Sequence, residues 1–425
     1  MPNHKQALPS SQYGGLELSM TESAAFHPMP LPSPTLSGGL VLLFAVACAL
    51  SVANVYYAQP LLDALALDFG FSQASIGIVV TVTQVGCALA LLLVVPLGDL
   101  VNRRRLIIVQ LCLLCATLAA VGLASSPVAL LAGMLGTGLL GTAMTQGLIA
   151  YAASAAAPAQ RGRVVGAAQG GVVIGLLLAR SVAGLVADLS GWRAVYFVSA
   201  ATALLMLLVL WRVLPAQAAA ERLSYFRLIS SMFIMLATER VLQIRGLLAM
   251  LMFAAFSIFW TALVLPLSAP PYSFSHAAIG AFGLVGVLGA LATTRAGRWA
   301  DRGHGQRTTG VALLLLLASW LALALMPHSL WALTLGIVLL DMGGQAIHVV
   351  NQSMIFQTQP AAHSRLVACY MLFYTVGSGA GAILSTSMYA AAGWSGVCLL
   401  GAIVSLLALL FWGVTLPRLK RSFPK

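Results

Sequence analysis

The positive charge of this chain is sorted by position along a ladder of apolar segments. Of its 22 Lys and Arg residues, 20 lie in the two tails or in alternate connections between the segments. The opposite connections hold only Arg193, beside the acids Asp63, Asp68 and Asp188. Because short basic loops stay on the cytoplasmic side of a membrane, this pattern predicts a multi-pass protein of the cytoplasmic (inner) membrane with both termini in the cytoplasm.

Twelve apolar runs are long enough to cross a hydrocarbon layer about 30 Å thick as helices. They cover residues 38–62, 74–97, 106–124, 128–152, 164–187, 194–211, 246–267, 277–294, 308–326, 330–353, 367–389 and 397–416. Lipid offers no hydrogen bonds to the backbone, and the runs are continuous rather than alternating, so helices are favoured over a barrel. The composition agrees, since 60% of the residues are hydrophobic and only 8% are charged.

Several function classes are disfavoured by what the sequence lacks. The basic residues are spread one loop at a time without interleaved aromatics, which is not the pattern of a nucleic-acid surface. A phosphate-binding loop for ATP is missing, and so are paired catalytic motifs, so we expect no enzyme and no cofactor. All six cysteines lie in predicted spans. Cys112 and Cys115 have metal or redox spacing, but their apolar surroundings predict small core residues, and we expect no metal site.

The chain repeats itself with a period near 200 residues. Pro158, Arg163, Gly191 and Trp192 recur 202 positions later as Pro360, Arg365, Gly393 and Trp394. A basic turn after the second apolar run, Gly98 to Arg105, is matched by Gly297 to Gly303 after the eighth. The repeat predicts a cytoplasmic tail (1–37), a six-helix bundle (38–212), a cytoplasmic linker with an amphipathic helix (213–245), a second six-helix bundle (246–416) and a basic tail (417–425).

Two six-helix halves, a long linker and a Gly-x-x-Ala-Asp-Arg turn resemble the major facilitator superfamily over residues 38–416. The resemblance implies an all-α membrane fold of twelve transmembrane helices in two pseudo-symmetric bundles. It also implies a cytoplasmic gate at the two turns. The gate candidates are Gly98, Asp99, Arg103, Gly297, Asp301 and Arg302. In the first turn, Asn102 stands where the family usually has Asp.

Three further stretches resemble bacterial members of the family that export drugs or metabolites. They are Asn54 to Pro60, Gly191 to Arg193 and Phe256 to Trp260. The antiporter signature of the fifth helix is half present, because Gly171 and Gly175 fit it but Leu176 replaces its proline. Glycines also recur at helical spacing in the fifth and eighth helices, where they could provide sliding surfaces between the halves or simply tight packing.

Two charged side chains lie deep within predicted spans, Arg180 in the fifth and Asp341 in the tenth. An ionisable group in hydrocarbon usually faces a partner, a cavity or a transport route. The resemblance places these helices in opposite halves near the central interface, so we expect both residues at one shared site. They could carry coupling protons, or form a static structural ion pair.

Asp341 is followed at helical spacing by Gln345, His348 and Gln352, which places four polar side chains on one face. Such a stripe must face protein or water, which favours substrate or proton handling over interhelical bonding. The resemblance adds further candidates for the substrate cavity, namely Asn54, Tyr57, Gln59, Gln146, Trp260, Tyr370 and Tyr374. Phe253, Phe256 and Trp260 form an aromatic stripe that could contact an apolar ligand or serve only packing.

These observations predict a secondary transporter that moves a small organic molecule by alternating access. We expect proton-coupled export, with uptake or facilitated diffusion of a sugar or metabolite as the alternative. A sensor or scaffold without transport is the alternative from another class. The expected partners are the substrate, protons and lipid, with no nucleic acid, and the chain is expected to be a monomer.

Overall fold

The computed structural model describes residues 36–157, 160–215, 224–356 and 363–422. The predicted N-terminal tail, Pro158, Pro360 and the side chains of the basic C-terminal tail lie outside the described residues. Within the described ranges, every regular element is a helix. Nine of the described helices are long and apolar enough to cross a membrane. Helices α1 and α11 add shorter apolar segments, and α14 holds two predicted spans.

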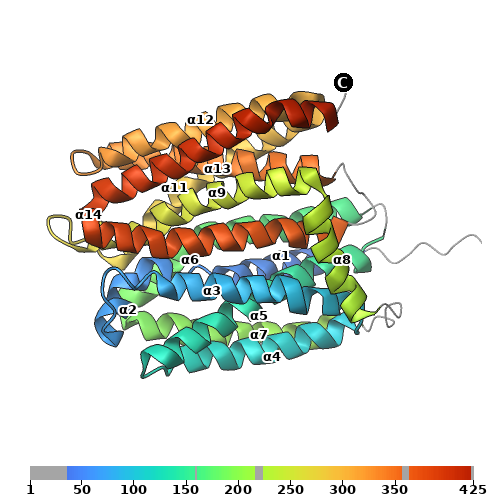
Figure 1. Cartoon of the computed structure of the whole chain (residues 1–425). Helices are drawn as coiled ribbons and strands as arrows, with labels where there is room; N and C mark the ends of the chain where they lie inside the picture. Colours follow the sequence, from blue (N-terminus) through green and yellow to red (C-terminus); the bar gives the residue numbers. More distant parts are fainter. Residues whose placement is uncertain (1–35, 158–159, 216–223, 357–362, 423–425) are drawn as a thin grey trace, which may run out of the picture. The chain divides into compact units, whose positions relative to one another are not determined.

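The first bundle lies in the lower part of Figure 1. Its elements are α1 (Gly38–Ala53), η1 (Gln59–Leu61), α2 (Leu62–Phe69), α3 (Ile78–Leu89), η2 (Ala90–Val94), η3 (Val95–Asp99), α4 (Arg103–Gly122), α5 (Pro127–Ala155), α6 (Arg161–Ser190) and α7 (Trp192–Val213). The second bundle contains α9 (Arg240–Ala262), α10 (Val264–Ser268), α11 (His276–Trp299), η4 (Ala300–His304), α12 (Gly305–Ala324), α13 (Leu330–Phe356) and α14 (His363–Ser422). The prediction of an all-helical membrane fold with two six-helix bundles is confirmed.

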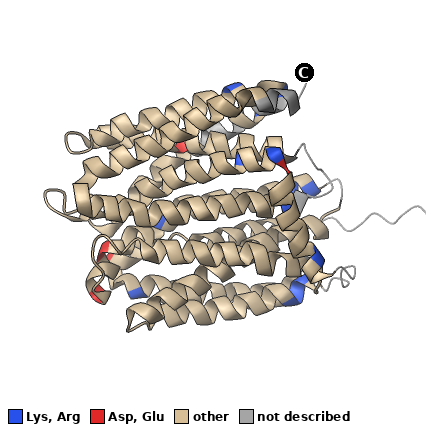
Figure 2. Ribbon diagram, in the orientation of Figure 1, with Lys and Arg blue, Asp and Glu red and all other residues tan. Residues whose placement is uncertain are grey.

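The two ends of the helices differ in charge. Figure 2 shows most Lys and Arg gathered at one end, while acidic residues lie at the opposite end. We call the end with the turns at 99–103 and 300–305 the basic end. The acidic end is the opposite one, and it carries Asp63, Asp68 and Asp188. Helix α8 (Tyr225–Thr238), which connects the two bundles in the sequence, lies at the basic end. Its Ser231 hydroxyl accepts a hydrogen bond from Arg365 of α14 at 3.0 Å. The domain boundary in residues 213–245 stays a prediction.

The repeated Gly-Trp pair has the same structural role in both bundles. Gly191 and Gly393 have positive φ angles of 80° and 63° between consecutive helices. A side chain at such a φ is strained, so glycine permits the sharp reversal. The following tryptophans tie the turn to its bundle, since the Trp192 indole donates to Asp68 at 2.8 Å and the Trp394 indole to the Leu323 carbonyl at 2.9 Å.

The sequence predicted one continuous helix over the first apolar run, residues 38–62. The structure breaks this run into separate helices. Helix α1 ends at Ala53, and the chain continues through turns into η1 and α2. The Asn54 amide donates back to the Leu50 carbonyl at 2.7 Å, which competes with the backbone ladder. Pro60 lacks an N–H and occupies the start of η1. This break redirects the chain and places Gln59 against α6.

Candidate functional site

A buried polar cluster lies where the two bundles meet. We call it the central cluster, and it consists of Arg180 of α6, Trp260 of α9 and Asp341 of α13. Each of the three is only 3% exposed. The Arg180 guanidinium lies over the Trp260 ring, 4.1 Å from its centroid, in a cation–π contact. Both side chains are close enough to Asp341 to interact with its carboxylate. The cluster therefore joins two charges from opposite bundles.

The first bundle holds the Arg180 guanidinium in place. Its Nε donates to Gln59 Oε1 at 2.9 Å, and its Nη1 donates to the Leu176 carbonyl at 3.5 Å. The Tyr56 ring covers a second side, with its centroid 5.4 Å from the guanidinium carbon. Gln59 therefore positions Arg180, and its predicted place in the substrate cavity stays a prediction. Tyr56 was missed, because sequence reasoning favoured the adjacent Tyr57.

Among the described residues, three atoms of the central cluster have no hydrogen-bond partner of regular geometry, although the Trp260 indole lies close enough to the Asp341 carboxylate to interact with it. They are Arg180 Nη2, Trp260 Nε1 and Asp341 Oδ1, and all three are buried. In the described part of the chain, no ion pair joins Arg180 directly to Asp341. A buried polar group without a partner costs about 1–3 kcal/mol, and more when it is charged. The site thus presents two donors and one acceptor whose bonding capacity is unused.

Aromatic side chains line the region between the central cluster and the basic end. The Tyr56 and Tyr374 hydroxyls form a hydrogen bond between the bundles. The Phe253 ring packs edge-on against Tyr374 with centroids 4.1 Å apart, and against His348 at 5.3 Å. His348 Nδ1 lies 3.0 Å from the Tyr370 hydroxyl. The structure thus brings together His348, Tyr370 and Tyr374, three residues selected from the sequence.

A second buried cation, Arg245, is a finding that the sequence analysis missed. The sequence placed it in the exposed linker, but it lies in α9 and is fully buried. Its Nη1 donates to Thr309 Oγ1 at 2.9 Å and to Asn351 Oδ1 at 3.2 Å, while Nε and Nη2 have no partner. The apolar run was counted only from Gly246, one residue too late to include this arginine. An earlier helix start would have placed it on the face packed against α12 and α13.

Other site candidates are not members of the central cluster. Asn54 Oδ1 accepts a hydrogen bond from Ser199 of α7 at 2.5 Å, and Tyr57 also interacts with Ser199, inside the first bundle. Gln345 and Gln352 lie on α13 and are partly exposed. Their roles in a substrate cavity stay predictions.

The predicted gate residues lie at the basic end. Arg103 donates to the Gly98 carbonyl at 2.9 Å and to the Ala150 carbonyl at 3.3 Å. Together with Gln146, Gly98 and Arg103 line a small cavity inside the first bundle. In the second turn, Gly297 lies in α11 and Arg302 is exposed. The side chains of Asp99 and Asp301 lie outside the described residues, so a gate ion pair stays a prediction.

The bundles pack closely at the acidic end. Ser181 of α6 donates to the Gly280 carbonyl of α11 at 2.9 Å, and Thr81 of α3 donates to the Gly379 carbonyl of α14 at 2.8 Å. Towards the basic end, a Cβ added at Gly166 or Gly170 of α6 would meet no atom of the described residues within 4 Å. Gly184 is therefore in close contact with α11 at the acidic end, Gly171 and Gly175 pack against α1 of the same bundle, and no described residue covers Gly166 and Gly170.

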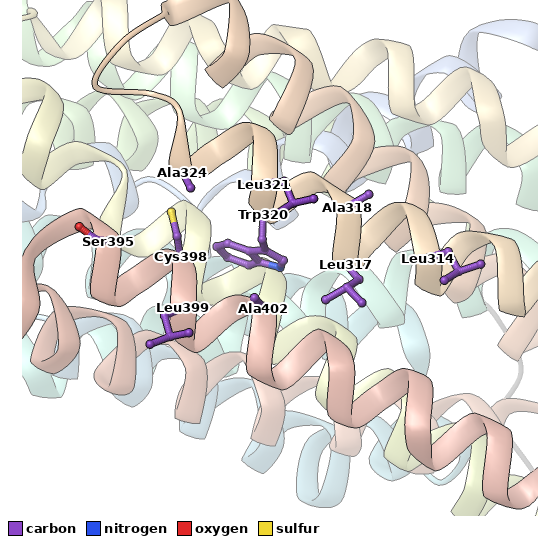
Figure 3. Close-up of a pocket in the computed structure, with 10 residues that line it drawn as sticks. All are labelled: Leu314, Leu317, Ala318, Trp320, Leu321, Ala324, Ser395, Cys398, Leu399 and Ala402. Carbon is purple, nitrogen blue, oxygen red and sulfur yellow. The ribbon is translucent and has the colours of Figure 1, made fainter.

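A larger pocket lies on the outer face of the second bundle, between α12 and the C-terminal part of α14 (Figure 3). Its volume is about 630 Å³ and its lining is almost entirely apolar. Leu321 and Leu399, which line it, are 75% and 63% exposed. Because it lacks charged groups and faces away from the central cluster, this pocket fits lipid chains rather than a polar substrate.

Comparison with known proteins decides the family. The family model described as Major Facilitator Superfamily matches residues 42–233 and 245–425. The chain belongs to the major facilitator superfamily. An uncharacterized transporter, YgaY of Escherichia coli, is 45% identical over 386 residues, which cover 90% of this chain and 97% of that protein. A probable transporter of Streptomyces coelicolor is 30% identical, with 88% and 86% of the two chains covered.

Solved structures agree on the fold. The inward-facing, unoccupied crystal structure of a bacterial homologue of the human lysosomal transporter Spinster has a TM-score of 0.73. It is 16% identical, and the match covers 88% of this chain and 96% of that one. The family match and the relatives named as transporters show that this chain is a multi-pass membrane transporter of the major facilitator type.

Proposed function

We propose that this major facilitator protein is a secondary active transporter that exports a small organic molecule in exchange for protons. In this proposal the basic end faces the cytoplasm, as the distribution of arginines predicts. The substrate binds at the central cluster, between the bundles. The energy comes from the proton gradient across the membrane.

The observation that carries this proposal is the unused bonding capacity of the central cluster. Arg180 and Trp260 offer donors, and Asp341 offers an acceptor, in a dry region supplied by both bundles. A substrate with an acceptor group near a donor group would satisfy all three atoms at once. The neighbouring aromatic side chains of Phe253 and Phe256 would contact its apolar part.

Alternating access is supported by the asymmetry of the contacts between the bundles. The acidic end is held together by hydrogen bonds from side chains of one bundle to backbone carbonyls of the other, whereas no described residue covers Gly166 and Gly170 of α6 nearer the basic end. Exchange between this state and one closed at the other end would expose the central cluster to each side in turn. The contact between Tyr56 and Tyr374 lies on this interface and must break in that exchange.

Asp341 is the proposed proton carrier. It is a buried carboxylate beside a cation, and its Oδ1 is free to bind a proton or a substrate donor. Binding of a proton would weaken its attraction to a substrate cation and to Arg180. Competition between the two ligands for one carboxylate couples their movements in opposite directions.

The test uses the purified full-length chain in liposomes, with a panel of small amphipathic amines, acids and zwitterions. We expect an imposed pH gradient to accelerate the transport of at least one compound. In Asp341→Asn the acceleration should fall at least tenfold, whereas the control Asp68→Asn at the acidic end should keep it.

If Asp341→Asn keeps the same dependence on the gradient, Asp341 is not the proton carrier. Transport that is driven by the substrate's own gradient and ignores pH would indicate facilitated diffusion instead. If neither direction shows flux for any compound in the panel, the sensor or scaffold alternative is favoured.

A further inference from the structure

A single histidine joins the two bundles at the acidic end. His276 is the first residue of α11 in the second bundle, and it precedes the apolar run 277–294. Its Nε2 lies 3.0 Å from Asp63 Oδ1, and its Nδ1 lies 3.2 Å from Asp188 Oδ1. Asp63 belongs to α2 and Asp188 to α6, so both carboxylates come from the first bundle. The imidazole ring and the two carboxylates are each about a quarter exposed.

Backbone contacts fix this histidine in position. The His276 N–H donates to Asp188 Oδ1 at 3.0 Å, and the Ala277 N–H donates to Asp188 Oδ2 at 2.8 Å. Asp188 therefore caps the start of α11 from the neighbouring bundle. An ideal Cβ at Gly184 would lie 2.1 Å from the His276 carbonyl oxygen, which shows how closely α6 approaches.

The two ring contacts differ between the protonation states of the histidine. A neutral imidazole has one N–H donor and one acceptor nitrogen, whereas an imidazolium has two donors. Ionised carboxylates only accept, so a neutral ring can bond to Asp63 or Asp188 but not to both. Asp63 and Asp188 are the charged groups that face His276 from the described elements packed against it. The observed geometry, with both ring nitrogens near carboxylate oxygens, is that of an imidazolium.

We propose that His276 is a proton-operated latch that holds the acidic ends of the two bundles together. The latch rests on the alternating access proposed above, and it adds a control on that motion which is separate from the central cluster. With a proton, one positive charge bridges two negative ones and the acidic end stays closed. Without the proton, one ring nitrogen loses its hydrogen bond to a carboxylate. The other nitrogen then donates from an uncharged ring, which is a weaker contact.

The direction of the pH effect follows from the same contacts. The pKa of His276 is raised above its usual value, first by the hydrogen bond to Asp63 and then by the charges of both acids, against the opposing effect of burial. The latch is therefore fully closed below the usual histidine pKa and is released as pH rises through the raised one. Acid at this end of the protein favours the state seen here.

The latch can be tested without a substrate and without a gradient, so its failure differs from failure of the transport proposal. Spin labels would be placed at Leu67→Cys on α2 and Trp331→Cys on α13, after replacement of the native cysteines. These two positions are 88% and 84% exposed at the acidic end of opposite bundles. Pulsed electron-spin distances in the full-length chain then report the ratio of closed to open molecules between pH 5 and pH 8.

We expect this ratio to fall at least tenfold from pH 5 to pH 8 in the otherwise unchanged chain. His276→Gln should make it independent of pH. Asp63→Asn keeps the Asp188 cap of α11 and should reduce the change to less than threefold, so a folding defect in the histidine variant would not end the test. Arg193→Gln, also at the acidic end, should behave like the unchanged chain.

Two results would overturn the latch. One is a pH response in His276→Gln equal to that of the unchanged chain. The other is a response that survives in both latch variants but disappears in Asp341→Asn, which would assign the pH effect to the central cluster. A flux measurement is not needed for either conclusion.

Discussion

Replacement of Gly184 by alanine should open the acidic end of this transporter. Gly184 lies on α6 where that helix meets the start of α11. A Cβ there would be 2.1 Å from the His276 carbonyl oxygen and 2.5 Å from its carbon. Both atoms belong to backbone, so neither can rotate away as a side chain would. The two helices must separate before a methyl group fits.

The size of the effect follows from this overlap. An ordinary carbon–oxygen contact is longer by about 1 Å, and one extra methyl forced into a packed interface costs about 1–3 kcal/mol. Since each 1.4 kcal/mol is a factor of ten in an equilibrium constant, closed molecules should become about 5 to 150 times rarer relative to open ones. Alanine also favours helix over glycine, but that gain is the same in the open and closed states and cancels.

The assay is the distance distribution between labels at positions 67 and 331, measured at a fixed acidic pH. Gly170→Ala is the matched control, because it adds the same methyl to the same helix where no atom of the described residues lies within 4 Å. We expect the control to resemble the unchanged chain and Gly184→Ala to show the longer distance. An unchanged closed population in Gly184→Ala would refute the conclusion that the contact between α6 and α11 closes this end.

Two stability predictions concern the turns at the acidic end. Gly393→Ala places a side chain at φ 63° and ψ −159°, a region nearly restricted to glycine, and should cost about 1–3 kcal/mol. The control is Gly413→Ala, which adds the same methyl at a helical position. If Gly393→Ala lowers the melting temperature no more than this control does, the predicted strain at position 393 is wrong. The pKa of Asp68 is lowered by its hydrogen bonds from Trp192 and then Arg193. Because the Asp68 side chain is 40% exposed, these contacts should contribute under about 1 kcal/mol to the free energy of unfolding. This stabilisation is present above the usual aspartate pKa and is lost as the pH falls through the lowered pKa of Asp68. The melting-temperature difference between the unchanged chain and Asp68→Asn should therefore narrow from pH 6 to pH 3, and a constant difference would count against the interaction.

Local composition was enough to predict most of the membrane-spanning helices, their approximate ends and the charge difference between the two ends of the bundles. Each of these depends on local composition, because about 20 apolar residues suffice for one crossing. The repeated Gly-Trp pair revealed the internal duplication, and the structure places a sharp reversal at Gly191 and Gly393 in the two copies. Arg180 and Asp341 were recognisable because a charge inside an apolar run is costly wherever its helix lies.

Which side chains meet across helices became known from the packing of the whole fold. Residues 56 and 374 form a hydrogen bond although 318 positions separate them, and helical periodicity shows which face is polar but not which helix lies opposite. Arg245 looked like a linker cation until the packing of α9 buried it. His276 looked like a loop residue until the fold placed two carboxylates beside its ring. Such contacts depend on the rotation and approach of whole helices, which are set by the sum of many small packing interactions and by no single stretch of sequence.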